Sequence, residues 1–212
     1  GLELSGGDLV LEVGPGRGAL TRWLAESGPG RLLLVEKDDD LAREMAARYP
    51  QAEVRNMDAM EFPWESLAPG SGWRVAGNLP YNVASPLIWE MVSRGPGVAR
   101  AVVMVQEEVA DRLASGPGSR SYGGLSAWVQ SFAVVRKLFS VSPGSFRPRP
   151  KVRSAVVRLD FFSRDARARN PEELSRVLRI CFTSRRKQLG RILKDYDRLK
   201  LEAWAKKVGV SL

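Results

Sequence analysis

LEVGPGRGALT, residues 11–21, decides the fold of this chain, because three glycines separate an apolar strand pattern from a helical one. Gly14, Gly16 and Gly18 stand where the backbone turns tightly and where a ligand has to approach the main chain. Their spacing fits the nominal G-x-G-x-x-G/A pattern through Ala19, which is typical of a dinucleotide-binding fold. A tight strand–helix turn without a ligand is the alternative interpretation.

Carboxylates follow the next two strand patterns, which favours a ligand. Glu36 ends the apolar run RLLLVE, 22 residues after Gly14. At that place an acid accepts hydrogen bonds from both ribose hydroxyls of an adenosine-containing cofactor. Asp58 closes the third strand pattern and could accept from an adenine amino group, although a helix cap or a solvated turn explains Asp58 equally well. Together the three strand ends outline one crevice.

Strand and helix patterns alternate over the first 110 residues. Runs that are apolar on both faces, separated by helical spacing, indicate a parallel sheet covered by helices. Right-handed crossovers then give an α/β fold with a doubly wound, Rossmann-like sheet. The predicted strands are residues 8–13, 31–36, 52–55, 73–76 and 101–105, extended by 132–135 and 152–161, and the predicted helices are 18–26 and 40–49.

The pattern changes after Phe162. Residues 171–182, 185–194 and 199–208 have the spacing of three short helices, the first of which can be capped by Asn170. We therefore expect two domains, a sheet domain at residues 1–162 and a small C-terminal helical domain at residues 163–212.

Basic residues are concentrated in the last third of the chain. The whole sequence has 33 Lys and Arg against 24 Asp and Glu, a net charge of +9. Residues 1–135 carry a net charge of −5, whereas residues 136–212 carry +14. This imbalance favours a polyanion as partner. An anionic membrane and a merely solvated basic surface are the alternatives.

Composition excludes several classes of protein. The chain has no histidine, which removes Ser-His-Asp and Cys-His catalysis and ordinary zinc enzymes, so we expect no metal. Its one cysteine, Cys181, cannot form an internal disulfide and is expected to be a core thiol without a role. No apolar run reaches the roughly 18 residues of a membrane span, so we expect no membrane association.

The tetrapeptide NLPY, residues 78–81, follows the fourth strand pattern and indicates methyl transfer to an exocyclic adenine nitrogen. That nitrogen is a poor nucleophile, because its lone pair is delocalised into the ring. The Asn78 side chain and the Leu79 carbonyl can accept both N–H bonds and direct the lone pair outward. Pro80 shapes the loop, and Tyr81 offers a flat face to an extruded base. A sulfonium methyl donor needs no strong base. A simple Asn-Pro turn is the alternative.

Eight segments in order make the chain resemble the RNA adenine N6,N6-dimethyltransferase family, which modifies small-subunit ribosomal RNA. The segments are LEVGPGRGALT (11–21), VEKDDDLA (35–42), NMDAMEF (56–62), GNLPYNVASPLI (77–88), VVMVQEEVADRL (102–113), YGGLSAWVQ (122–130), SFRPRPKVRSAVVRL (145–159) and FTSRRKQLGRIL (182–193). The resemblance implies S-adenosylmethionine as cofactor and ribosomal RNA, or the pre-ribosomal small subunit, as partner. It also implies a cytoplasmic enzyme of ribosome biogenesis, which we expect to be a monomer.

The resemblance also implies roles for residues at matching positions. Those implied to hold the cofactor are Glu12, Gly14, Gly16, Gly18, Glu36, Asp58 and Asn78. Those implied to hold the target base are Asn78, Leu79, Pro80, Tyr81 and, on its other face, Phe146. An aromatic residue in a proline-rich loop could also be a lid or a core residue.

Basic residues beside this site are expected to bind RNA phosphates, for which arginine forks are suited. They are Arg147, Arg149, Lys151, Arg153, Arg185, Arg186 and Lys187, the last three at the start of a predicted helix. An ion-pair network within the protein is the alternative.

Two features depart from the family pattern. A segment with a Q-x-F-L-x-D-like pattern precedes the glycine loop in the family and is absent here, so we expect this sequence to be truncated. The residue before Asp58, usually glycine, is Met57.

The expected reaction is dimethylation of two adjacent adenosines near the 3′ end of small-subunit RNA. Alternatives are a large-subunit methylase of the macrolide-resistance type and a non-catalytic RNA-binding assembly factor. A nicotinamide oxidoreductase would leave NLPY and the basic third without a role.

Overall fold

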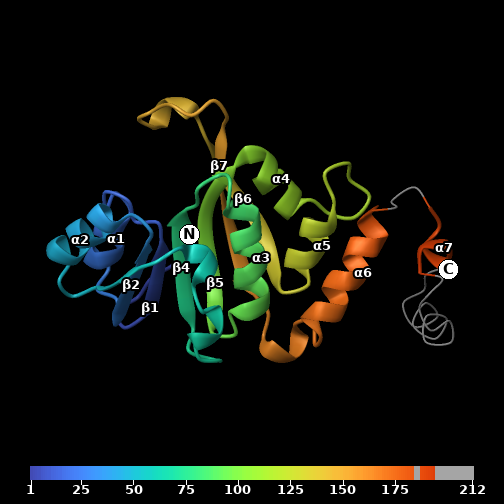
Figure 1. The fold of residues 1–212 in the computed structure, drawn as a ribbon, viewed down its shortest axis with the longest axis horizontal. Coiled ribbons are helices and arrows are strands. Elements are labelled where there is room, and N and C mark those ends of the chain that lie inside the picture. Colours follow the sequence, from blue (N-terminus) through green and yellow to red (C-terminus); the bar gives the residue numbers. More distant parts are fainter. Residues whose placement is uncertain (184–186, 194–212) are drawn as a thin grey trace. The chain divides into compact units, whose positions relative to one another are not determined.

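The computed structural model describes residues 1–183 and 187–193 (Figure 1). The chain divides into two compact units, Gly1–Arg167 and Ala168–Leu212. The first unit contains the sheet and the candidate site. The described part of the second contains α6 (Pro171–Thr183) and α7 (Leu189–Ile192). The functional assignment of residues 1–162 and 163–212 as separate domains stays a prediction.

Seven strands form one sheet in the order β3-β2-β1-β4-β5-β7-β6. Strands β1 to β5 are parallel, and β7 runs antiparallel to both β5 and β6. The predicted doubly wound, Rossmann-like α/β fold is therefore confirmed. The strands are β1 (Leu9–Val13), β2 (Arg31–Glu36), β3 (Glu53–Asn56), β4 (Trp73–Asn78), β5 (Val98–Gln106), β6 (Ala133–Val141) and β7 (Ser154–Phe161).

Helices connect the strands of the first unit. They are α1 (Thr21–Glu26), α2 (Asp39–Arg48), α3 (Ala84–Arg94), α4 (Glu107–Ala114) and α5 (Gly124–Gln130), with short 3₁₀ turns η1 (Ala59–Glu61), η2 (Trp64–Ser66), η3 (Pro143–Ser145) and η4 (Arg164–Ala166). Helix α2 packs on β2 and β3, whereas α4 packs on β5, β6 and β7. The chain adds β2 and β3 on one side of β1 and then β4 and β5 on the other, so the sheet has a switch point between β1 and β4, where open α/β sheets bind ligands.

The core shows why the central strands are apolar on both faces. Val10, Leu32 and Leu34 pack with Leu24 of α1 and Met45 of α2 in one buried cluster. In β5 the alternate residues Ala101, Val103 and Val105 are fully buried, whereas those between them are half-buried. Successive side chains of a strand point to opposite faces, so helices cover one face of β5 more completely than the other.

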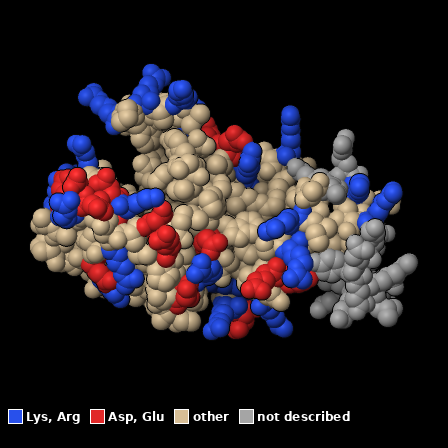
Figure 2. Space-filling view, viewed as in Figure 1, with Lys and Arg blue, Asp and Glu red and all other residues tan. Residues whose placement is uncertain are grey.

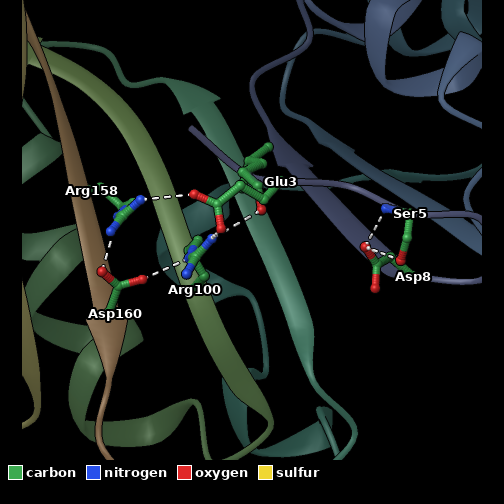
Figure 3. Close-up of polar contacts among 7 residues, drawn as sticks. Glu3, Ser5, Asp8, Arg100, Arg158 and Asp160 are labelled. Atoms are coloured by element: carbon green, nitrogen blue, oxygen red, sulfur yellow. Dashed lines mark hydrogen bonds and ion pairs between the residues drawn. The ribbon is translucent and has the colours of Figure 1, made fainter.

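A closed ring of charges holds the N-terminal segment over β5 and β7 (Figure 3). Asp160 accepts from Arg100 Nε at 2.6 Å and from Arg158 Nε at 2.9 Å. Glu3 completes the ring by accepting from Arg100 and, at 3.0 Å, from Arg158. The two arginines hold the pKa of the Glu3 carboxyl below its usual value, Arg100 most strongly.

Some predicted bounds were wrong. Strand β6 continues to Val141, well past Val135, because its residues stay paired with β7 along the edge of the sheet although most of them are exposed. Helix α7 begins at Leu189 and not at Arg185, because Gln188 has an extended backbone; Lys187 therefore precedes the helix.

Arg185, Arg186 and the helix predicted at 199–208 lie outside the described residues. Within residues 1–183 and 187–193, no helix combines the length and apolarity that crossing a membrane requires.

Candidate active site

The glycine loop leaves β1 at Val13 and turns at once. Gly14, Gly16 and Gly18 have φ values of +68°, +55° and +81°, which L side chains rarely adopt. A Cβ on Gly18 would also meet Met45 Sδ at 3.2 Å, whereas one on Gly16 would meet nothing within 4 Å. The loop therefore needs glycine for its conformation, and it leaves open space beside Gly16 for a ligand.

Glu36 ties this loop to the end of β2. Its Oε2 accepts from the Gly16 N–H at 3.0 Å, and its Oε1 accepts from the N–H groups of Lys37 and Asp38 at 2.9 and 3.0 Å. A carboxylate oxygen has two lone pairs, so Oε2 keeps one for a ribose hydroxyl. An open hollow of about 580 Å³ is lined by Glu36 and the next four residues, Lys37, Asp38, Asp39 and Asp40.

Glu12 lies one strand away and is almost completely buried, with 1% of its surface exposed. Its Oε2 has no hydrogen-bond partner in the described structure. Burial raises the pKa of Glu12 to about 7, since it penalises the charged form; the neighbouring Thr21 hydroxyl opposes this rise, and the Glu36 carboxylate adds to it. A buried acid with an unused oxygen therefore lies close to the glycine loop.

Asp58 has local structural partners. Its Oδ1 accepts from the Met60 N–H at 2.9 Å and caps η1, and its Oδ2 accepts from Lys37 Nζ at 2.7 Å. Lys37 and the Met60 amide lower the pKa of the Asp58 carboxyl. The helix-cap alternative is thus present. A contact of Asp58 with adenine stays a prediction.

NLPY lies directly beside the glycine loop. Asn78 ends β4, and its backbone oxygen is 4.0 Å from the position of a Cβ on Gly14. A Cβ on Gly77 would meet the Val13 oxygen at 2.8 Å, so glycine permits this close approach of β1 and β4. The side-chain amide of Asn78 is exposed and forms no hydrogen bond within the described residues. The two motifs, 64 residues apart in the sequence, therefore meet at one edge of the sheet.

The rest of the tetrapeptide is anchored to its neighbours. Leu79 is buried and its N–H donates to the Met104 oxygen at 3.1 Å, whereas Pro80 is exposed. The hydroxyl of the half-buried Tyr81 lies 2.6 Å from Ser154 Oγ, at the start of β7. This bond ties the Tyr81 side chain to the start of β7.

Phe146 lies in the β6–β7 loop, residues 142–153, which projects beyond the sheet at the top of Figure 1. Its side chain is half-buried, and in the described structure no ring contact joins it to Tyr81. The loop leaves from the edge at which β4 and β5 end, since Gln106 pairs with Ser154. Phe146 therefore lies in a loop at the same edge of the sheet as NLPY, and among the described residues its ring does not contact Tyr81.

Basic side chains gather on this loop (Figure 2). Arg147, Arg149 and Lys151 are exposed and form no ion pair with any described residue. Arg153 differs, because its Nε donates to Glu107 Oε2 at 2.9 Å. For Arg153 the ion-pair alternative is therefore present, and a contact of Arg153 with RNA stays a prediction. Lys187 is exposed, and Arg185 and Arg186 lie outside the described residues.

Glu107 was not predicted. It begins α4 immediately after β5, at the same edge as Asn78. No contiguous motif marked it, because its partners, Lys137 and Arg153, are distant in the sequence.

Comparisons with known proteins identify the family of this chain. The family described as "Ribosomal RNA adenine dimethylase" matches residues 1–211. "Ribosomal RNA small subunit methyltransferase A" of Maridesulfovibrio salexigens is 46% identical over 211 residues, which cover 100% of this chain and 80% of the relative. The protein of that name from Nitratidesulfovibrio vulgaris Hildenborough is 50% identical over 201 residues, covering 92% and 75%.

Solved structures give the same result. A dimethyladenosine transferase from Plasmodium falciparum has a TM-score of 0.81 and 29% identity, covering 100% of this chain and 78% of that one. The 23S rRNA methyltransferase ErmE has a TM-score of 0.74 and 26% identity, covering 99% and 85%. Fold and sequence similarity agree, and the chain belongs to the ribosomal RNA adenine dimethylase family.

Proposed function

We propose that this chain transfers methyl groups from S-adenosylmethionine to N6 of adenosines in small-subunit ribosomal RNA, dimethylating two adjacent adenosines near the 3′ end during ribosome assembly. As a member of its family the chain is an S-adenosylmethionine-dependent enzyme that acts on ribosomal RNA adenines. The relatives named for the small subunit support that choice of RNA.

One observation carries the proposal, namely the contact between the two motifs. A Cβ built on Gly14 of the glycine loop would lie 4.0 Å from the backbone oxygen of Asn78 in NLPY. A methyl donor held by the first motif would therefore meet a base held by the second. Neither motif alone implies methyl transfer.

The residues around the glycine loop fit the cofactor. Gly16 offers open space and Glu36 has a free lone pair for ribose. Glu12 and Glu36 place acidic groups near a cofactor that carries a sulfonium cation. When bound, S-adenosylmethionine supplies the electrophilic methyl group. Asp58 is the candidate acceptor for a hydrogen bond from the adenine amino group, through the carboxylate that also accepts from Lys37.

The residues of NLPY act on the target base. The exposed Asn78 side chain and the Leu79 carbonyl would accept the two N–H bonds of the amino group, so that its lone pair is directed away from the ring. Tyr81 would stack on one face of the base and Phe146 on the other. Since Tyr81 is held by Ser154, its ring is already oriented before RNA binds.

The exposed basic residues of the β6–β7 loop are the candidates for phosphate contacts, with Lys187 as a further one. A-form RNA is recognised mainly by shape, phosphates and 2′-hydroxyls, which suits a loop of arginines. We propose a cytoplasmic location, because the substrate is ribosomal RNA, and a monomeric state for the enzyme.

The test is transfer of labelled methyl groups to unmethylated small ribosomal subunits, followed by mapping of the labelled nucleotides. We expect label on two adjacent adenosines near the 3′ end. Label only on large-subunit RNA would favour the macrolide-resistance type of methylase. Tight binding to small subunits without any label would favour an assembly factor.

A further inference from the structure

One carboxylate outside the site described above joins three elements. Glu107, the first residue of α4, accepts through Oε1 from Lys137 Nζ at 3.0 Å and from Ser140 Oγ. Its Oε2 accepts from Arg153 Nε at 2.9 Å. Its backbone N–H donates to the Arg153 oxygen at 3.0 Å. Glu107 therefore uses both carboxylate oxygens and its amide on residues that are 30 to 46 positions away.

These partners lie at the two ends of one loop. Lys137 and Ser140 belong to the last part of β6, and Arg153 directly precedes β7, so residues 142–153 begin and end at Glu107. Asp111, one turn further along α4, also accepts from Lys137 Nζ, at 2.8 Å. Among the described carboxylates, however, only Glu107 binds both ends of the loop.

The electrostatics of the cluster keep this anchor charged. The Ser140 hydroxyl and the Lys137 ammonium, with a smaller contribution from Arg153, lower the pKa of Glu107 to about 2. The carboxylate is therefore ionised throughout the range in which an enzyme of this kind works, and its hydrogen bonds to the two cations are charge-assisted.

The anchored loop carries the residues that the proposed function needs. Phe146 and the exposed Arg147, Arg149 and Lys151 all lie in it. At its β7 end, Ser154 also holds the hydroxyl of Tyr81. A displacement of the loop base would therefore move Phe146 and the basic residues relative to NLPY.

We propose that Glu107 is a positioning residue, which fixes the base of the β6–β7 loop so that the loop presents Phe146 and its basic residues to RNA beside NLPY. This inference rests on the proposed function for the role of the loop. Glu107 itself touches neither cofactor nor base; it acts through the loop that it holds. A loop that is anchored at both ends is already partly ordered, so it loses less conformational entropy when RNA binds.

Glu107→Gln is the direct test, because it keeps the shape of the side chain and removes the charge. Glu108→Gln is the matched control, since Glu108 is the next residue of α4 and pairs only with Arg112 on the surface. Hydrogen exchange followed by mass spectrometry should show about tenfold faster exchange in residues 137–154 of Glu107→Gln. Strand β2 should be unchanged, and Glu108→Gln should match the wild type throughout.

Steady-state methylation separates positioning from general stability. In Glu107→Gln we expect KM for the small subunit to rise about tenfold, because part of the binding free energy is spent on ordering the loop. Turnover at saturating RNA and the Kd of S-adenosylmethionine should stay within about twofold of the wild type. A purely structural role would lower the melting temperature and leave KM for RNA unchanged.

The outcomes separate the two proposals. Unchanged exchange in residues 137–154 would show that Glu107 does not anchor the loop. Faster exchange with unchanged KM would show that RNA does not depend on the anchored loop. If the wild type methylates no ribosomal RNA, the proposed function fails. The hydrogen-exchange measurement still shows, by itself, whether Glu107 anchors the loop. Should Glu107→Gln not fold, Ser140→Ala removes one of the two contacts that Glu107 makes with β6 and should give a smaller increase in exchange.

Discussion

At the scale of single residues, Glu12 makes folding depend on pH. Its pKa is about 7 in the folded chain, against an ordinary value of 4.5. The folded state therefore binds this proton more tightly than the unfolded state does. The resulting stabilisation is complete below about pH 4.5, falls as the pH rises, and is lost above about pH 7.

The prediction concerns the free energy of unfolding. Glu12→Gln, which mimics the protonated acid, should remove this pH dependence and should be more stable than the wild type at pH 8, by up to about 3 kcal/mol. Urea denaturation at pH 5 and pH 8 measures the difference. Exposed Glu26→Gln is the control and should follow the wild type. A wild type and Glu12→Gln with parallel pH profiles would contradict the buried, protonated state of Glu12.

Asn78 is expected to act mainly in the transition state. Its carbonyl matters most as the amino nitrogen becomes tetrahedral, so its loss should lower turnover more than binding. Asn78→Ala should reduce the methylation rate about 10² to 10³-fold, with cofactor and RNA affinity little changed. Asn82→Ala, an exposed asparagine four residues further on, is the control and should retain activity. A wild-type rate in Asn78→Ala would exclude the lone-pair mechanism.

Tyr81 combines a stacking face with an anchored hydroxyl. Tyr81→Phe keeps the face, so methylation should be only mildly reduced. The variant leaves the buried Ser154 hydroxyl without its partner, which should cost about 1 kcal/mol of unfolding free energy. Ser154→Ala should cost a similar amount, and the double variant should be less destabilised than the sum of the two. Additive losses in denaturant titrations would show that the 2.6 Å contact contributes nothing.

At the scale of elements, the predictable ones were those buried on both faces. The apolar run RLLLVE predicted the bounds of β2, Arg31–Glu36, because a central strand buries successive residues on both of its faces, as it does here for the last five of the six. Strand β6 is half-exposed at the sheet edge, and its polar residues hid its true length. The glycine loop and NLPY were predictable because each is contiguous in the sequence. Glu107 was not, because its partners come from β6 and the start of β7, and only the folded sheet brings them together.

The charge ring on β5 and β7 should stabilise both strands and the N-terminal segment. Asp160 accepts from Arg100 and Arg158, whose side chains are largely buried. Asp160→Asn would leave the two cations with only Glu3 to balance them, so we expect a loss of about 1–3 kcal/mol in unfolding free energy. Chemical denaturation measures it, with the exposed Asp165→Asn as control. Equal stability of the two variants would mean that the ring is energetically neutral.

At the scale of the whole molecule, the basic charge of the last third divides into two kinds. Arg153 and Arg158 are neutralised by acids of the chain itself. Arg147, Arg149 and Lys151 have no such partner among the described residues and project on the β6–β7 loop. Net charge alone therefore overstates the surface that is free to bind phosphates, and among the described residues the β6–β7 loop carries three of the free charges.

RNA affinity should consequently fall steeply with salt, and the loop should account for a definite part of that slope. Each phosphate contact contributes about 0.7–0.9 to the slope of log K against log salt. Replacing Arg147, Arg149 and Lys151 together by glutamine should therefore lower the slope by about 2 to 3. Binding to a small-subunit RNA fragment, titrated between low and moderate salt, measures the change.

The matched control removes three arginines that are already paired within helices, Arg22, Arg43 and Arg112. That triple variant has the same net charge as the loop variant, so a general effect of charge would lower both slopes equally. A phosphate-binding loop would lower only the first. If the loop variant keeps the wild-type slope, the phosphates must be bound elsewhere, and the anchoring of the loop by Glu107 would then serve Phe146 alone.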